Sequence, residues 1–236
     1  MTAWKLVGAA VLALLGTVLA SGVWVGLLIA NLRTTPALPW APVATAGVLW
    51  SAWRYANGWG LPRRTSAARR ALLRARRVEP AAFALALVAG GLALVALAAL
   101  WIVSFQTGLM RGNALPDFSR FPLQTVAAVV AMGAVVGAVT EEAGFRGYLQ
   151  SLLERHCSPR VAILLAALAL APGHASTQGL AAPTFGFYLL VDAMLGVTAF
   201  LCDSILPGMV VHAAGLAAFF ALIWPGDASR PVGAAA

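Results

Sequence analysis

Long apolar blocks dominate this sequence and constrain its fold more than any other feature. Of the 236 residues, 61% are apolar and only 10% are charged, well below the roughly 25% charge of a soluble domain. A helix that crosses a membrane needs about 20 consecutive apolar residues, and several blocks approach or exceed that length. The composition therefore excludes an ordinary soluble domain, a disordered chain and a collagen-like fibre. It predicts an all-α fold, a polytopic bundle of membrane helices.

Seven blocks are long enough, or nearly long enough, to be membrane helices. They cover residues 4–30, 38–55, 81–104, 122–139, 161–173, 183–201 and 205–224. Within the first block, Val18-Leu19-Ala20 fits a signal-peptidase site, but the apolar run continues for ten residues past Ala20. That run is too long for the apolar region of a signal peptide. The sequence therefore predicts seven to eight transmembrane helices, with the first one retained.

Positive charge is concentrated in one loop. Sixteen Lys and Arg against eight Asp and Glu give a net charge of +8, and seven of the arginines lie between Arg63 and Arg77. In a membrane protein such an excess marks a cytoplasmic loop, so no nucleic-acid partner is implied. We expect loop 57–80 and the Met1 end to be cytoplasmic. The interleaved Ala and Leu leave two possibilities for the loop, a solvated segment or a helix that binds anionic lipid headgroups.

Three carboxylates lie inside apolar stretches, where a charge is costly and marks a functional site by default. They are Glu141, Glu142 and Asp192, and the basic residue in the same region is Arg146. On a helix Glu142 and Arg146 are i and i+4, so they share a face and can pair. Glu141 has no basic residue at i+3 or i+4. The spacing predicts a structural Glu142–Arg146 ion pair and leaves Glu141 for chemistry.

Two histidines, His174 and His212, also lie in or at the ends of apolar stretches. With the turn centred at Ser158, Glu141 lies 17 residues before it and His174 lies 16 after it. In an antiparallel helical hairpin both side chains then sit at nearly the same height, roughly 20 Å from the turn. Pro172-Gly173 is expected to break the helix there and to free backbone groups for a polar cavity. We expect Glu141, His174 and His212 to converge.

One carboxylate and two histidines support two routes to an activated water. Glu141 can act as the general base, helped by His174, while His212 donates a hydrogen bond to a developing oxyanion. Alternatively, Glu141, His174 and His212 form a zinc ligand set with an open fourth position. Both routes predict a hydrolase.

These residues resemble the CPBP membrane-protease family, which comprises the type II CAAX prenyl endopeptidases and bacteriocin-processing or immunity proteins, also called Abi. The Glu-Glu-x-x-x-Arg motif of that family is complete here at Glu141, Glu142 and Arg146. The resemblance covers about residues 120 to 224. The chain is predicted to have three parts: N-terminal transmembrane helices over 1–121 with the basic loop 57–80, a CPBP-like catalytic core over 122–224, and a short polar tail over 225–236.

The other two family motifs are partial. Leu170 stands where Phe-x-x-x-His has Phe before His174, and Leu216 stands where His-x-x-x-Asn/Asp has its polar residue after His212. A leucine cannot supply that polar group, which Asp192 or Ser204 then has to replace.

The resemblance implies an intramembrane endopeptidase with Glu141 as base, His174 as its helper and His212 as metal ligand or oxyanion donor. A zinc-assisted mechanism and a metal-free mechanism both agree with these residues. The implied substrate is a membrane-embedded or lipidated peptide or protein, and the Ala-rich chain with short loops favours a bacterial plasma membrane. Leu216 keeps a second hypothesis open, a catalytically silent relative that acts as an immunity or scaffold protein. A small proton-coupled transporter is a third, weakened because no inverted repeat is visible.

Overall fold

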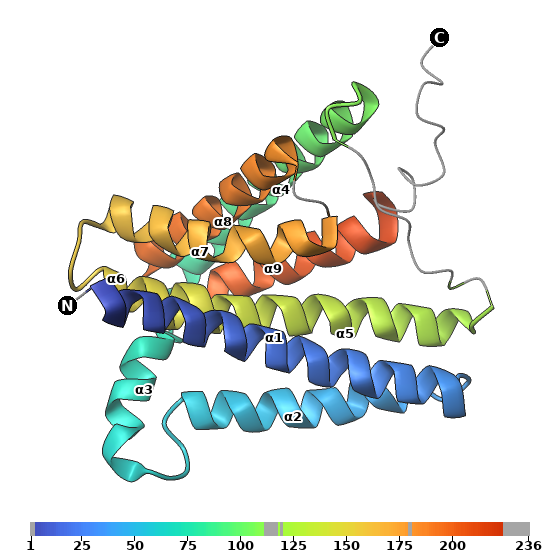
Figure 1. Cartoon of the computed structure of the whole chain (residues 1–236), viewed down its shortest axis with the longest axis horizontal. Helices are drawn as coiled ribbons and strands as arrows, with labels where there is room; N and C mark the ends of the chain where they lie inside the picture. Colours follow the sequence, from blue (N-terminus) through green and yellow to red (C-terminus); the bar gives the residue numbers. More distant parts are fainter. Residues whose placement is uncertain (1–2, 111–117, 119, 179–180, 224–236) are drawn as a thin grey trace.

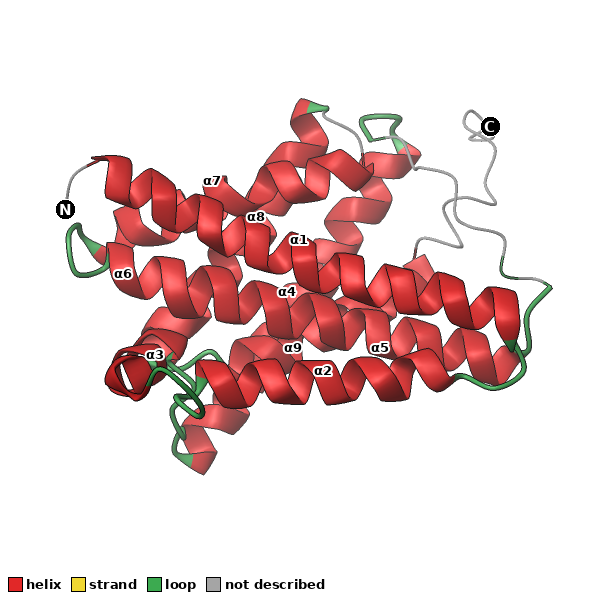
Figure 2. Cartoon of the chain, turned by 60° about the horizontal axis from the view of Figure 1, so that its bottom comes forward, coloured by secondary structure: helices red, strands yellow, loops and turns green. Residues whose placement is uncertain are grey.

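The chain folds into a bundle of helices in the computed structural model, which describes residues 3–110, 118, 120–178 and 181–223 (Figure 1). The α-helices are α1 (Ala3–Thr34), α2 (Trp40–Ala56), α3 (Ser66–Leu73), α4 (Pro80–Gln106), α5 (Leu123–Glu141), α6 (Ser151–Leu153), α7 (Pro159–Gln178), α8 (Ala182–Cys202) and α9 (Leu206–Ala218). Three tighter or wider helical segments are η1 (Arg63–Thr65, 3₁₀), η2 (Glu142–Gln150, π) and η3 (Phe219–Ile223, π). Within these ranges no residue is in a strand, and the all-α class predicted from the sequence is confirmed (Figure 2). The predicted polar tail lies outside the described residues.

Five helical segments are long and apolar enough to cross a membrane. They are Trp4–Thr34, Pro80–Gln106, Leu123–Leu153, Ala182–Cys202 and Leu206–Ile223. Two other predicted spans correspond to shorter helices, the 17-residue α2 with Arg54 in its last turn and the apolar part of α7, Pro159–His174. The multi-pass architecture is therefore confirmed, with five full-length spans among the described residues and two shorter helices beside them.

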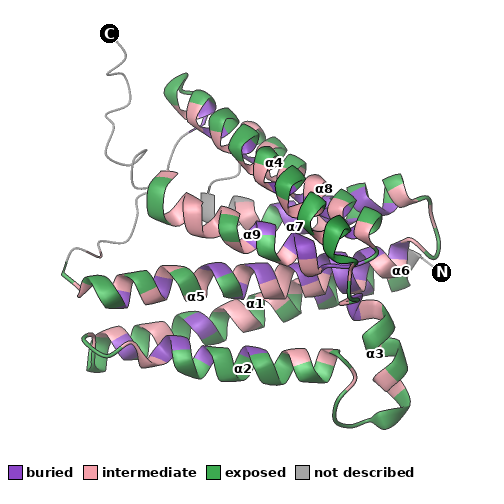
Figure 3. Cartoon of the chain, turned by 180° about the vertical axis from the view of Figure 1, so that it is seen from behind, coloured by how far each residue is buried: buried purple, intermediate pink, exposed green. Residues whose placement is uncertain are grey.

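The helices pack in an order that differs from their order along the chain. α1, α2 and α5 pack against one another, α5 also packs against α9, and α9 packs against α4 (Figure 1). α7 and α8 form the most extensive pair and lie over η2 and α9. Burial is concentrated where α7, α9 and η2 meet, whereas the outer faces of α2 and α4 are exposed (Figure 3). Exposed apolar side chains such as Leu92 and Val95 are the surface that lipid covers in a membrane.

The helix that carries Glu141 differs in length from its apolar block: the block ends at residue 139, whereas the helix continues well beyond it, as the predicted hairpin requires. α5 passes directly into η2 and then into α6, so the helical segment ends only at Leu153. Phe145 and Leu149 on η2 are fully buried against Ala9 and Ala13 of α1. The charged residues inside this stretch do not stop the helix, because their partners lie on neighbouring helices.

α7 also differs from its predicted shape, because Pro172 does not break it. The helix runs through Pro172 and His174 to Gln178. A proline removes one backbone hydrogen bond from a helix, and membrane helices tolerate that loss where neighbouring groups compensate. The predicted break at Pro172-Gly173 is wrong, and His174 is held by a continuous helix.

The basic segment is partly docked against the bundle. Arg74, which has a left-handed backbone (φ 56°), is buried and forms ion pairs with Glu154 at 3.0 Å and Asp203 at 2.9 Å. Its carbonyl accepts a hydrogen bond from the amide of Ile205. Neither alternative predicted for this loop included such an anchor, which two acids far away in the sequence provide. The segments that carry Arg74, Glu154 and Asp203 therefore lie together at one end of the bundle.

The first turn of α4 is capped from outside the span. Glu79 accepts a hydrogen bond from the amide of Ala82 at 2.9 Å. Bonds from the backbone amides of Ala81 and Ala82 hold the pKa of Glu79 below its ordinary value, because they stabilise the ionised carboxylate.

Candidate active site

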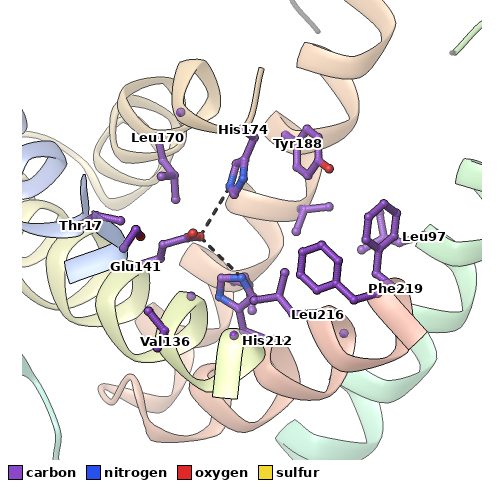
Figure 4. Close-up of a pocket in the computed structure, with 18 of the residues that line it drawn as sticks. Thr17, Leu97, Val136, Glu141, Leu170, His174, Tyr188, His212, Leu216 and Phe219 are labelled. Atoms are coloured by element: carbon purple, nitrogen blue, oxygen red, sulfur yellow. Dashed lines mark ion pairs between the residues drawn. The ribbon is translucent and has the colours of Figure 1, made fainter. Parts of the chain in front are cut away.

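A cavity of about 590 Å³ lies inside the bundle, lined by α1, α4, α5, α7, α8, α9 and η3. Most of its lining is apolar, and the ionisable side chains on its wall are Glu141, His174, His212 and Tyr188. Figure 4 shows Glu141 and the two histidines facing one another, with Leu216 and Phe219 beside them. A concave apolar pocket with a few convergent polar groups is the usual form of a catalytic or binding site.

The three residues predicted to converge are brought together. Glu141 Oε2 lies 3.6 Å from His174 Nε2 and 3.6 Å from His212 Nε2 (Figure 4). The three side chains come from the end of α5, from α7 and from α9. Both distances exceed a direct hydrogen bond but suit a water that contacts all three groups. Glu141 Oε2 is also shielded from solvent and has no hydrogen-bond partner among the residues that the structure describes.

Glu142 points to a different set of partners. Its Oε1 lies 3.0 Å from His212 Nδ1 and 3.3 Å from Arg146 Nη1, and the residue is fully buried. The predicted Glu142–Arg146 ion pair is therefore present in the structure. Gly208 makes room for it, because a Cβ there would lie 3.0 Å from Glu142 Oε2. The two adjacent glutamates thus serve separate surroundings, with Glu141 in the cavity and Glu142 behind it.

Asp192 of α8 completes the buried ion network. Its carboxylate accepts a hydrogen bond from Arg146 Nη2 at 2.7 Å and lies 3.7 Å from His174 Nε2. Arg146 therefore connects Glu142, which contacts His212, with Asp192, which faces His174. Each histidine near Glu141 also faces a carboxylate that this one arginine holds in place.

Tyr188 is a site residue that sequence reasoning missed. Its ring stacks on the His174 imidazole with centroids 4.5 Å apart and planes 17° apart, which restrains the orientation of His174. Tyr188 precedes Asp192 by four residues on α8. The i, i+4 spacing from an intramembrane acid is the signal that places both on one helix face.

The acids outnumber the permanent cations in this cluster, so its net charge depends on how many protons it carries. Three carboxylates, Glu141, Glu142 and Asp192, face one guanidinium from Arg146. In a membrane interior, uncompensated charge is expensive, so protons on neighbouring groups would offset the remaining negative charge. His212 donates through Nδ1 to Glu142 when that carboxyl group is ionised, because a carboxylate only accepts. Its Nε2 can donate toward the cavity only in the doubly protonated form.

The other predicted residues divide into two groups. Leu170 and Leu216, the two departures from the family motifs, both line the cavity. Leu216 fits closely, since a Cβ on Gly137 would lie 2.7 Å from its Cδ1. Ser204 is elsewhere, with its hydroxyl donating to the Arg76 carbonyl at 2.7 Å and accepting from the Leu206 amide. The structure therefore does not bring Ser204 to Glu141, whereas Asp192 reaches the site through His174.

The zinc hypothesis needs a set of donors arranged around one point. Among the described residues, no group of three or more His, Cys, Asp or Glu is arranged to hold a metal ion.

The fold and the site define a multi-pass membrane protein with a carboxylate–histidine centre inside its helical bundle. Residues 122–216 match the family model described as type II CAAX prenyl endopeptidase Rce1-like, and the matched segment contains Glu141, His174 and His212. Over this segment the match confirms the family resemblance predicted from the motifs. No curated protein and no solved structure matches the chain.

Proposed function

We propose that this protein is an intramembrane endopeptidase that cleaves a membrane-associated peptide or protein with a water activated by Glu141. The observation that carries the proposal is the position of the Glu141 carboxylate, 3.6 Å from both His174 Nε2 and His212 Nε2 in an apolar cavity. A shielded carboxylate oxygen without a hydrogen-bond partner is an acceptor available to a water. The match of residues 122–216 to the Rce1-like family model supports peptide-bond hydrolysis as the reaction.

The first step is proton abstraction from the water. Glu141 takes a proton as the water oxygen bonds to the carbonyl carbon of the scissile peptide, and a tetrahedral oxyanion forms. His174, restrained by the stacked Tyr188 ring and faced by Asp192, orients the water next to Glu141. General-base assistance of this kind accelerates a reaction by about 10²–10⁴-fold.

The second step is collapse of the tetrahedral intermediate. His212, protonated on both nitrogens, keeps Nδ1 on Glu142 and donates from Nε2 to the oxyanion. The C–N bond then breaks, and the proton on Glu141 passes to the leaving amine. The products are a carboxylic acid and an amine, with one water consumed and Glu141 returned to its carboxylate form.

The proposed substrate follows from the surroundings of the site. The cavity wall is mainly apolar and contains Leu97, Trp101 and Phe219, so it favours a membrane-embedded or lipidated segment over a free polar peptide. We place the protein in a bacterial plasma membrane on the basis of its Ala-rich composition and short loops.

The experiment that tests this function uses purified protein in lipid vesicles with a set of membrane-anchored peptide reporters. We expect at least one reporter to be cut at a single bond, and mass spectrometry to identify a new carboxyl end and a new amino end. If the protein retains its helical circular dichroism but cuts none of the reporters, the proposal is contradicted.

Leu216 favours a second candidate function, a catalytically silent relative that acts as an immunity or scaffold protein. The apolar Leu216 side chain lines the cavity beside His212 where the family motif has a polar residue (Figure 4). Under the leading proposal the wild-type protein is active, and an added amide donor supplements the oxyanion site.

We expect Leu216→Asn to raise kcat by about tenfold, because one added oxyanion donor contributes up to 10²–10³-fold in favourable geometry. Asn is close to Leu in shape, so the contact with Gly137 is kept. The matched control is Leu97→Asn, which adds an amide to the α4 wall of the same cavity and is expected to leave kcat unchanged. Cleavage by the Leu216→Asn variant together with none by the wild type would support the silent function instead.

A further inference from the structure

A second cavity, of about 400 Å³, lies on the other side of the Glu141-bearing helix from the candidate active site. We call it the α1–α2 groove. Its wall is formed by α1, α2, the end of α3, and the stretch from Val139 to Tyr148. α2 lies beside the C-terminal part of α1, with α3 across one end (Figure 1). Most of the lining is apolar, with Leu12, Val23, Val48 and Leu49 among its members.

Arg69 of α3 closes one end of the α1–α2 groove. Its Nη2 donates to the carbonyls of Trp59 at 3.2 Å and Gly60 at 3.3 Å, and its guanidinium lies 3.9 Å from the centre of the Tyr55 ring. The other two nitrogens, Nε and Nη1, are shielded from solvent and have no hydrogen-bond partner among the described residues. Buried charged donors without an acceptor are costly, so this geometry calls for an anionic acceptor.

The protein does not supply that acceptor in the part of the chain that the structure describes. The arginines that form ion pairs there are Arg74, Arg76 and Arg146, and Arg69 is not one of them. The neighbouring Arg70 is exposed and can be neutralised by solvent ions. Among the arginines of this segment, Arg69 therefore combines unmatched donors with direct access to an apolar groove.

The position of the α1–α2 groove identifies the class of anion. Tyr55 and Trp53 line it next to the arginine-rich segment, and aromatic and basic residues gather at the headgroup level of a membrane. A ligand that fills the site needs a negative group at Arg69 and an apolar tail along α1 and α2. An anionic phospholipid of the leaflet that faces the basic segment has both.

We propose that the α1–α2 groove is a specific binding site for one anionic phospholipid, with the phosphate at Arg69 and an acyl chain between α1 and α2. This proposal is more specific than a general attraction of anionic lipids by the Arg63–Arg77 segment, because it assigns recognition of the headgroup to one side chain. It does not depend on the proposed peptidase function, because the groove wall does not include Glu141, His174 or His212.

The test is lipid retention by the purified full-length protein, measured by native mass spectrometry with phosphatidylglycerol and with phosphatidylcholine that carries the same acyl chains. We expect Arg69→Gln to weaken phosphatidylglycerol binding about tenfold or more, the loss expected from one or two charge-assisted hydrogen bonds. Arg70→Gln removes the same charge from the exposed neighbour and is expected to change binding less than twofold. Inorganic phosphate at the same concentration is expected not to compete, because it lacks the tail.

A second variant tests the apolar half of the site. Gly16 lines the α1–α2 groove, and a Cβ there would meet nothing within 4 Å, so Gly16→Leu is expected to fold and to fill the groove. It should weaken phosphatidylglycerol binding severalfold with Arg69 intact, whereas Glu141→Gln should bind as the wild type does. Three results would each overturn the proposal. They are an equal loss of binding in Arg69→Gln and Arg70→Gln, unchanged binding in Arg69→Gln, and unchanged binding in Gly16→Leu.

Discussion

Replacing Glu141 with Gln is expected to lower kcat for reporter cleavage by about 10²–10⁴-fold, the usual contribution of a positioned general base. The amide keeps the size of the side chain but cannot take a proton from water. Unlike Glu142, Glu141 has no arginine within ion-pair distance in the described part of the chain, and it lines the cavity rather than the buried network. The free energy of unfolding should therefore change little, and the loss should appear in kcat more than in KM.

The matched control for this variant is Glu79→Gln. Glu79 is exposed and caps α4 outside the site, so the same substitution there should leave kcat at the wild-type value. Both proteins are compared by cleavage rate in vesicles and by thermal unfolding. A Glu141→Gln protein that cleaves the reporter at the wild-type rate would show that Glu141 is not the base.

Replacing Arg146 with Met is expected to lower the free energy of unfolding by about 3–5 kcal/mol, the cost of breaking a buried ion pair by removing one partner. Arg146 is 2% exposed and is the cation between Glu142 and Asp192, which are 0% and 1% exposed. Without it two carboxylates lie uncompensated behind the site. The measurement is unfolding in mixed detergent micelles with increasing denaturing detergent.

Two companion variants separate the loss of charge compensation from a general defect. Arg70→Met removes an exposed arginine and is expected to change stability by less than about 1 kcal/mol, as surface charges usually do. Arg146→Met combined with Glu142→Gln and Asp192→Asn removes all three charges and should regain part of the loss. A change below about 1 kcal/mol for Arg146→Met alone would contradict the role of this arginine as the centre of the network.

Most of the fold and the central part of the site followed from sequence because they depend on local rules. Apolar block length predicts membrane helices, and i, i+4 spacing placed Arg146 beside Glu142. The hairpin register placed His174 at the height of Glu141 because the rise per residue is the same in both helices. Each inference needed one helix, or two helices joined by a short turn.

The remainder depends on contacts between segments far apart in the chain. Arg146 meets Asp192 across 46 residues, and Arg74 meets Asp203 across 129. Nothing in the spacing fixes which distant acid pairs with which arginine, because the packing of α8 against η2 decides it. The helix break predicted at Pro172 is wrong for a similar reason, since a proline is tolerated where the surrounding bundle holds the helix.

The claim that Glu141 and His212 form one catalytic unit is tested most directly by a double-mutant cycle on kcat. The cycle compares Glu141→Gln, His212→Asn and the double variant with the wild type, using the same vesicle reporter and confirming that each protein folds. Residues that act as a unit are strongly non-additive, so we predict that the double variant is no slower than Glu141→Gln alone. The contrary result is a double variant whose kcat is lower than that of Glu141→Gln by the same factor that His212→Asn alone removes from the wild type. Such multiplying losses would contradict a shared site.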